Sequence, residues 1–449
     1  MLVDSWQRND GTETIDSILS WVQKRNETLH VEINKVSLDE CDDWHYDCSD
    51  GTIHNKNRSF FSIAGMKSVS GSNVVEQPVL LQKEIGYLGF ICKPINGVLH
   101  FLVQAKIEPG NVNTIQLSPT IQATKSNFTQ KHGGKKPMYL RYFINANKDN
   151  ILVDQIQSEQ SSRFLKKRNR NIIIVFDEDE KIECKPSHKW LTLGQIKALM
   201  HYPNLVNMDT RTVLSCIPYA LLDRNDVNCE DNPVLLSVFS LPEREKIVEM
   251  FHSVNNMKMF ESRENEIVDL YSLSDWEMKD GEYVCKKPYP MKVIFCDISI
   301  EEREVSHWCQ PLFEATGKAL FCLLCADVDG KREFLVRLTP EIGCFDTVEI
   351  GPTLQREAVY SGDEDEVSRL IFSKIANKDS IIFDSVLSEE GGRFYHEENR
   401  NIIIKIDKDE IKDLPSGYFW CNFATLNSLN MVNNCLNIQL RNLMSLLEI

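Results

Sequence analysis

The chain has 449 residues, a formal net charge of −16 at pH 7 and a sequence pI near 5.2. An acidic chain whose only basic run is the short segment 166–170 is not expected to bind nucleic acid. The chain shows no apolar run of membrane-spanning length and no signal-like start, so we expect a cytoplasmic protein without a membrane partner. Many of its 14 cysteines lie in apolar runs, and we expect these thiols to be reduced.

The first predicted element is a helix at residues 12–25. Ile15, Ile18, Leu19 and Trp21 recur there at helical spacing. We expect this helix to serve packing or a dimer contact.

Four potential metal ligands follow in an acidic loop, namely Cys41, His45, Cys48 and His54. Their spacing is not that of a standard zinc finger, and the related later segment 276–285 keeps only one cysteine. The spacing therefore predicts a protein without a metal ion.

Strand patterns then dominate, at residues 59–66, 74–81 and 84–92. From residue 99 to 108 apolar and polar residues alternate, which is typical of a half-buried strand, and residues 109–111 form a turn signal. Residues 114–124 are predicted as a further strand with one polar face, made of Gln116, Ser118, Thr120, Gln122 and Thr124. Such a row of hydroxyl and amide groups suits a sugar, which needs many neutral hydrogen bonds.

Helical patterns follow the strands. In chain order, the remaining predicted elements are strands at 141–143, 151–156 and 171–176, helices at 190–200 and 210–222, a linker at 223–233, a helix at 242–256 and a helical tail at 426–447. This order predicts an α+β fold.

The second half of the chain repeats the first. Gly97 aligns with Gly330, and the same offset of 233 places residues 101–103 on the identical residues 334–336. Farther on, an offset of 230 aligns Asn-Arg-Asn at 169–171 with Asn-Arg-Asn at 399–401, and three isoleucines follow each. We therefore predict two tandem domains, at residues 1–225 with the N-terminal helix and at residues 235–449.

The sequence resembles the sugar-nucleotide 2,3-dehydratase family, whose members act on dTDP-4-keto-6-deoxyglucose in deoxysugar biosynthesis. The segments that carry the resemblance are 51–54, 60–62, 88–90, 99–111, 116–127, 166–174, 190–195, 204–216, 308–311 and 388–396. The resemblance implies two duplicated Nudix-like domains with mixed β-sheets and flanking helices, a homodimer, a dTDP-linked 4-keto-6-deoxyhexose as substrate and no redox cofactor. The second copy departs from the pattern, with Glu341-Ile-Gly-Cys344 where the first has Glu108-Pro-Gly-Asn111.

The implied reaction is loss of water. The carbonyl at carbon 4 acidifies the proton on carbon 3, a base removes it, and the hydroxyl on carbon 2 leaves with help from an acid, giving a 3,4-diketo-2,6-dideoxy sugar nucleotide. This chemistry needs a base, a proton donor and stabilisation of the enolate oxygen. The sequence has no dinucleotide fingerprint, P-loop or Nudix hydrolase box, which disfavours redox chemistry and phosphate hydrolysis.

Three residues are the catalytic candidates. Glu108 is the candidate base or acid and Lys106 the candidate enolate stabiliser, and the alternative for this pair is an ordinary ion pair. Only the first copy has the lysine, because Thr339 stands at its position in the second copy. His132 is a candidate proton donor, or else simply a loop residue.

The candidate substrate contacts lie mainly in the first copy: Asn111, Gln116, Ser118, Thr120, Gln122, Thr124, Ser126 and Asn127, with Arg163 and Arg170 for the pyrophosphate. Both arginines recur as Arg393 and Arg400, so a structural role is the alternative.

A second candidate pocket is defined by Arg337, Thr353, Gln355, Arg393, Tyr395, His396 and Glu398. Its cluster at residues 393–398 is rich in acid–base groups, so it is either the active pocket or a source of residues that the first pocket borrows across an interface. Two other functions stay open: a non-catalytic sugar-nucleotide-binding protein, and a keto-sugar isomerase.

Overall fold

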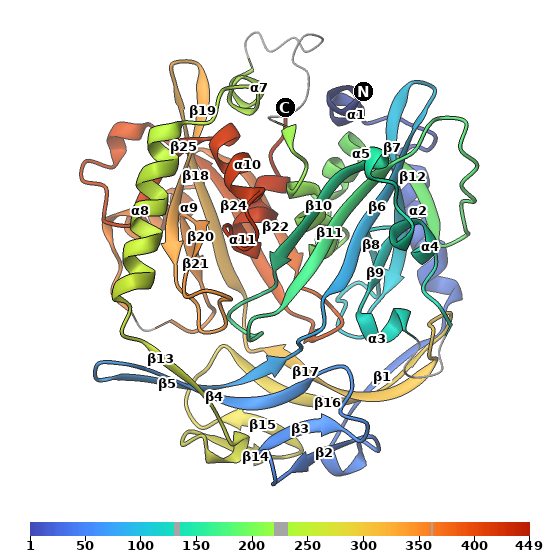
Figure 1. Cartoon of the computed structure of the whole chain (residues 1–449), viewed down its shortest axis with the longest axis vertical. Coiled ribbons are helices and arrows are strands. Elements are labelled where there is room, and N and C mark those ends of the chain that lie inside the picture. Colours follow the sequence, from blue (N-terminus) through green and yellow to red (C-terminus); the bar gives the residue numbers. More distant parts are fainter. Residues whose placement is uncertain (130–134, 220–231, 361) are drawn as a thin grey trace.

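The computed structural model describes residues 1–129, 135–219, 232–360 and 362–449. Two lobes lie side by side above a layer of β-strands (Figure 1). Each lobe contains a seven-stranded sheet, and two smaller sheets form the layer below them, which we call the base. No helix in the described ranges is long and apolar enough to cross a membrane.

The sheet of the first lobe has the order β10-β11-β6-β7-β12, with β8 paired to β7 and β9 paired to β6. Its β6 and β11 are parallel, and the other pairs are antiparallel. The strands are β6 (Gly86–Ile95), β7 (Val98–Ile107), β8 (Ile115–Ser118), β9 (Ile121–Ala123), β10 (Ile151–Ser158), β11 (Arg168–Val175) and β12 (His188–Thr192).

The second lobe repeats this pattern as β22-β24-β18-β19-β25, with β20 on β19 and β21 on β18. The strands are β18 (Ala319–Val328), β19 (Lys331–Thr339), β20 (Glu349–Pro352), β21 (Leu354–Arg356), β22 (Ile381–Ser388), β24 (Glu398–Lys405) and β25 (Tyr418–Asn422). The central hairpin of each lobe turns at an Asx-Gly pair, Asn96-Gly97 or Asp329-Gly330, and all four residues have positive φ, as a type I′ turn requires.

A fork in each sheet explains one wrong prediction. β6 and β7 pair near their turn and then separate, so the chain at residues 115–123 pairs first with β7 and then with β6. Thr120 lies at the fork, where its hydroxyl accepts a bond from the Ile91 amide at 2.9 Å and donates to the Leu102 carbonyl. Residues 114–124 are therefore two short strands rather than one, and their even-numbered side chains do not share a face along a single strand.

The base joins the two halves by exchanging strands. One sheet has the order β14-β15-β16-β17-β23, and β1 from the N-terminal half pairs with its β16. The other sheet has the order β13-β4-β3-β2, with β5 also paired to β4, and its strand β13 comes from the C-terminal half. The strands are β1 (Val31–Val36), β2 (Trp44–Asp47), β3 (Thr52–Asn55), β4 (Ser62–Ser70), β5 (Asn73–Leu81), β13 (Glu264–Val268), β14 (Trp276–Lys279), β15 (Glu282–Cys285), β16 (Met291–Ile300), β17 (His307–Ala315) and β23 (Phe394–Tyr395). The division into residues 1–225 and 235–449 stays a prediction, but the base interleaves the two segments.

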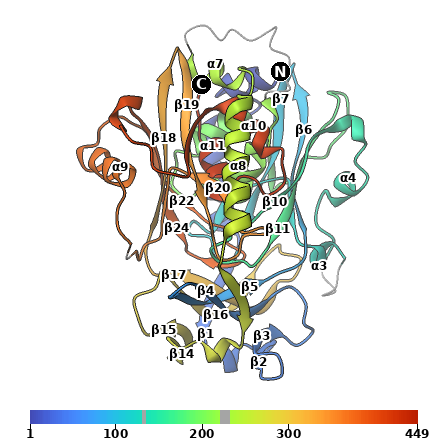
Figure 2. The same ribbon diagram turned by 60° about the vertical axis from the view of Figure 1, so that its left-hand side comes forward.

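The helices are α1 (Leu2–Gln7), α2 (Ile15–Thr28), α3 (Lys125–Phe128), α4 (Leu140–Ile144), α5 (Leu193–Leu199), α6 (Met208–Ser215), α7 (Pro233–Val238), α8 (Arg244–Phe260), α9 (Glu366–Asn377), α10 (Phe423–Asn430) and α11 (Ile438–Ser445). Figure 2 shows α8 in front, where it packs on α10 and β25. The predicted strand at 141–143 is wrong, since these residues form part of α4. Of the predicted linker at 223–233, all but the last two residues lie outside the described ranges.

Two buried arginines connect the halves at the centre, where α6 packs on α11. Arg211 on α6 donates to the carbonyl of Ser388 at 2.5 Å, and Arg441 on α11 donates to the carbonyl of Ser158. Each guanidinium group thus satisfies a backbone acceptor of the opposite half, so the two lobes form one continuous interior.

Candidate active site

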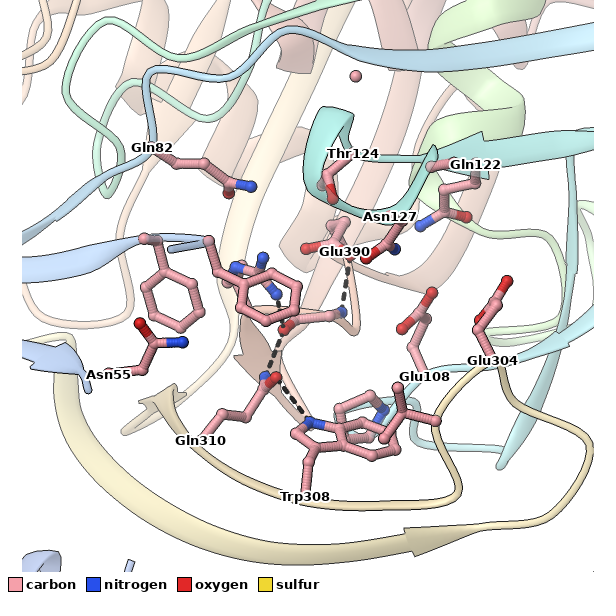
Figure 3. Close-up of a pocket in the computed structure, with 18 of the residues that line it drawn as sticks. Asn55, Gln82, Glu108, Gln122, Thr124, Asn127, Glu304, Trp308, Gln310 and Glu390 are labelled. Atoms are coloured by element: carbon pink, nitrogen blue, oxygen red, sulfur yellow. Dashed lines mark hydrogen bonds between the residues drawn. The ribbon is translucent and has the colours of Figure 1, made fainter. Parts of the chain in front are cut away.

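A cavity of about 550 Å³ lies between the first lobe and the base. Both halves of the chain line it. The first half contributes Asn55, Phe60, Phe61, Gln82, Glu108, Gln122, Thr124, Asn127, Glu159, Lys167 and Asp209, and the second contributes Arg303, Glu304, Trp308, Gln310, Glu390 and Arg393, among others. Figure 3 shows Glu108, Glu304 and Glu390 around the same space as Gln122, Thr124 and Asn127.

Glu108 and Glu304 are two carboxyl groups of this cavity with a lowered pKa. Glu108 follows the end of β7, and its Oε1 lies 3.3 Å from Lys106 Nζ and 3.2 Å from Arg303 Nη1. Burial alone would raise the pKa of Glu108, but Arg303 and Lys106 together hold it below its ordinary value. A negatively charged oxygen next to the cavity can accept a proton from a bound ligand.

The predicted pair Lys106 and Glu108 is brought together, but only Glu108 lines the cavity. Arg303 lines it instead of Lys106. Arg303 belongs to the six-residue loop 301–306 between β16 and β17, whereas two residues, 71–72, join β4 and β5 at the corresponding place in the first half. This length difference is visible when the halves are compared in sequence, and it is the signal that could have identified Arg303.

Three further carboxyl groups that line the same cavity have raised pKa values, and sequence reasoning missed all of them. Burial, with the nearby Glu390, raises the pKa of Glu159 to about 7. Burial and the neighbouring Glu159 and Glu390 raise the pKa of Asp209 well above its ordinary value, and burial and Glu108 raise that of Glu390. The cavity therefore holds carboxyl groups whose pKa values are raised beside Glu108 and Glu304, whose pKa values are lowered, and carboxyl groups with pKa values pushed apart suit acid–base catalysis.

Two cations lie near these groups. Burial lowers the pKa of Lys167 to about 8, and its Nζ donates to the carbonyl of Glu84. The guanidinium of Arg393 lies 4.2 Å from the ring centre of Phe61 and donates to the Gly392 carbonyl at 2.7 Å. The Nε of Arg393 is buried without a hydrogen-bond partner among the described residues, as is that of its counterpart Arg163.

Arg163, the counterpart of Arg393, has a different environment. Its Nη2 pairs with Glu357 at 2.9 Å and lies 3.7 Å from Glu397. The repeat places Thr124 and Lys167 at the positions of these two glutamates in the first half. The two carboxylates that pair with Arg163 thus have no counterpart around Arg393, whose acidic neighbours are instead Glu390, Glu108 and Glu84.

Three of the predicted substrate contacts line the cavity, namely Gln122, Thr124 and Asn127. The others do not, because their side chains bind the protein itself. Gln116 donates to Ser388 Oγ, Ser118 to the Pro119 carbonyl, Thr120 to Leu102, Ser126 to Glu84, Asn111 to the carbonyls of Lys106 and Thr114, Arg163 to Glu357, and Arg170 to Asp154. His132 lies outside the described residues.

Of the second predicted pocket, only Arg393 lines this cavity. Thr353 fills the fork of the second sheet as Thr120 fills the first, and Gln355 donates to Glu341 at 2.8 Å. Tyr395 stacks on His396 with ring centres 4.1 Å apart, Glu398 pairs with Lys318, and Arg337 donates to Tyr418. The dense cluster at residues 393–398 is thus divided between the cavity and other contacts.

Known proteins resemble this chain over nearly its whole length. A family model described as NDP-hexose 2,3-dehydratase matches it twice, at residues 15–217 and 247–447. Proteins named dTDP-4-dehydro-6-deoxy-alpha-D-glucopyranose 2,3-dehydratase are similar to it. The one from Saccharopolyspora spinosa is 35% identical over 95% of this chain and 90% of its own length. The one from Streptomyces violaceoruber is 32% identical over 95% of this chain and 95% of its own length. The one from Amycolatopsis orientalis is 32% identical over 96% of this chain and 89% of its own length.

Proposed function

We propose that this chain, which belongs to the NDP-hexose 2,3-dehydratase family, is a lyase that removes water across carbons 2 and 3 of a dTDP-linked 4-keto-6-deoxyhexose. The observation that carries the proposal is a cavity in which Glu108, with a lowered pKa, lies with Glu159 and Asp209, whose pKa values are raised. The product, a 3,4-diketo-2,6-dideoxy sugar nucleotide, serves deoxysugar biosynthesis.

The chemistry follows from these charges. Glu108 takes the proton from carbon 3, and the electrons of the C–H bond form an enolate whose oxygen the guanidinium of Arg303 stabilises. Glu159 gives a proton to the hydroxyl on carbon 2 as that C–O bond breaks, so one water molecule leaves. The remaining enol, with its hydroxyl on carbon 3, loses that hydroxyl proton and gains one at carbon 2 to become the 3,4-diketone. Lys106 acts through Glu108, because it keeps this carboxylate charged without lining the cavity.

The same cavity has places for the rest of the substrate. Arg393 and Lys167 bind the diphosphate, since both are cationic and Arg393 has an unused donor. Gln122, Thr124 and Asn127 bind the sugar hydroxyls. The rings of Phe61 and Trp308 offer the thymine base an apolar surface.

The coarser features of the fold support three structural proposals. The two lobes arose by duplication, because their sheets have the same strand order and the family model matches each half. That each lobe is Nudix-like is implied by the family resemblance. Only the cavity of the first lobe is catalytic, since Glu108 and Arg303 meet there, whereas Arg163, the counterpart of Arg393, is paired with Glu357. The protein works in the cytoplasm.

We propose a homodimer that forms through α8. The apolar face of α2, the first candidate for the contact, is covered within the chain at Ile18 and Val22, whereas Val248, Met259 and Phe260 on α8 are exposed. Light scattering should give twice the chain mass of 51.7 kDa. A particle of one chain mass at working concentration would contradict the dimer.

The function is tested by incubating the purified protein with dTDP-4-keto-6-deoxyglucose and following the product by mass spectrometry. We expect loss of the mass of one water molecule. A product of unchanged mass with altered sugar signals would establish the isomerase, and tight binding without any product would establish the non-catalytic binding protein.

A further inference from the structure

The hairpin of β2 and β3 brings three metal-binding side chains together. His45 and His54 are directly opposite each other in the antiparallel pair, and Asp47 lies two residues along the strand from His45, on the same face. The potential ligand atoms of these three residues all lie within 4.8 Å of one another.

The hydrogen bonds of His54 leave one ring nitrogen free to bind a cation. Its Nδ1 lies 2.9 Å from the carbonyl oxygen of Asn55, and since a carbonyl can only accept, Nδ1 carries the proton. Nε2 is buried and lies 3.5 Å from Asp47 Oδ2, and no other hydrogen-bond partner is present in the described chain. When Nε2 carries no proton, it and the carboxylate oxygen both present lone pairs, which a metal ion between them would satisfy.

The corresponding hairpin of the second half, β14 and β15, lacks these groups. Trp276 takes the place of Trp44, and the positions of His45, Asp47 and His54 are held by Glu277, Lys279 and Val284. The hairpin therefore folds without the three ligands, so their presence in the first half is not a requirement of the fold.

We propose that His45, Asp47 and His54 bind a divalent transition-metal ion such as Zn²⁺, with water completing the coordination. The sequence spacing of Cys41, His45, Cys48 and His54 disfavours a metal site, but the fold gathers a different set. Asp47 joins the two histidines, whereas the buried Cys41 interacts with Cys309.

The site is structural rather than catalytic. None of its three residues lines the cavity, but Trp44 and Asn55, which adjoin His45 and His54, do. A bound ion holds β2 against β3 and thereby fixes this part of the cavity wall.

Arg58 competes with the ion. Its Nη2 contacts Asp47 Oδ2, and the Ser49 amide donates to Asp47 Oδ1 at 2.9 Å. An ion that takes Oδ2 displaces the guanidinium, so removing Arg58 should strengthen metal binding.

The test is titration of the full-length, metal-stripped protein with Co²⁺, followed by calorimetry and by the visible spectrum. We expect one ion per chain, without the charge-transfer band that thiolate ligands give. His45→Ala, at an exposed position that folding does not need, should weaken binding on the order of a hundredfold. Arg58→Gln should tighten it, and His30→Ala, at another exposed histidine, should leave it unchanged.

The proposal also predicts that Zn²⁺ raises the unfolding temperature of the native chain and not that of His45→Ala. Turnover should be the same with and without chelator at a temperature where both forms stay folded. Equal binding by native and His45→Ala chains, or a thiolate band at stoichiometric Co²⁺, would overturn the site. Absence of any Co²⁺ binding would also overturn the site and would show that His54 and Asp47 form a simple ion pair.

Discussion

The amide of Gly110 donates a hydrogen bond of 2.7 Å to the carbonyl of Gly391. A Cβ at Gly110 would lie 1.7 Å from the carbonyl oxygen of Phe394, so only glycine fits. This contact seats the loop that carries Glu390 and Arg393 on the turn that carries Glu108. The candidate active-site cavity therefore depends on a backbone contact between two segments about 280 residues apart in the chain.

Gly110→Ala should disrupt this contact. We expect a loss of about 3 kcal/mol in stability, because backbone rather than a flexible side chain meets the new methyl group. The equivalent change Gly343→Ala, whose Cβ would lie 1.8 Å from the carbonyl oxygen of Phe164, meets the loop that carries Glu159 and Lys167, so it should also lower turnover. Chemical denaturation should show losses in both variants, and activity is compared at a temperature where both are folded. Native turnover in a folded Gly110→Ala variant would contradict the role of this contact in the site.

Lys106→Met should shift the pH dependence of kcat/KM. Burial raises the pKa of Glu108 and Lys106 helps to lower it, so without the lysine Glu108 takes up a proton at a higher pH. The acidic limb of the profile should move to higher pH, whereas Lys106→Arg, which keeps the charge, should move it much less. An unshifted limb in Lys106→Met would show that Glu108 is not the group that must be ionised.

Arg393→Gln should weaken binding of dTDP on the order of tenfold or more, because a charged donor to the diphosphate is lost. Arg163→Gln should leave dTDP binding intact. It should instead destabilise the fold by about 3 kcal/mol, since Glu397 would remain buried without its cation. Calorimetric titration and thermal unfolding of both variants separate the two roles, and the reverse pattern would move the nucleotide site to the other half.

Much of the fold could be predicted from the sequence, because it is recorded in local patterns. The Asx-Gly turns, the alternating strands and the repeat at offsets of 233 and 230 define two equivalent sheets. The fork at Thr120 could not be predicted in this way, since a change of strand partner leaves no mark on local periodicity. Neither could the interleaved base, which depends on pairing between strands about 260 residues apart, such as β1 and β16.

The site was only partly predictable for the same reason. Glu108, Gln122, Thr124 and Asn127 come from one segment whose polar composition is visible in sequence. Glu159, Asp209 and Glu390 enter the cavity from distant segments, and their altered protonation results from burial, which only the fold creates.

Glu349→Gln should make the protein less sensitive to alkaline pH. Burial raises the pKa of Glu349 to about 8. The folded chain therefore binds more protons than the unfolded chain, so this group lowers stability as pH rises from about 4.5 towards 8. Gln116 already holds the equivalent position in the first half, and glutamine can still accept the bond from Ser158. The unfolding temperature of the variant should exceed that of the native chain at pH 8 and match it more closely at pH 5, and an identical pH dependence would contradict this assignment.

The most direct test of the central account compares Glu108→Gln with Glu341→Gln, the same change at equivalent positions of the two halves. Turnover of dTDP-4-keto-6-deoxyglucose, followed by mass spectrometry as loss of water, should fall on the order of a hundredfold or more in Glu108→Gln, about 3 kcal/mol of transition-state stabilisation. Glu341→Gln should keep near-native turnover. If Glu341→Gln, or Tyr395→Phe with His396→Asn, abolishes turnover while a folded Glu108→Gln works normally, the chemistry belongs to the second half and the account is contradicted.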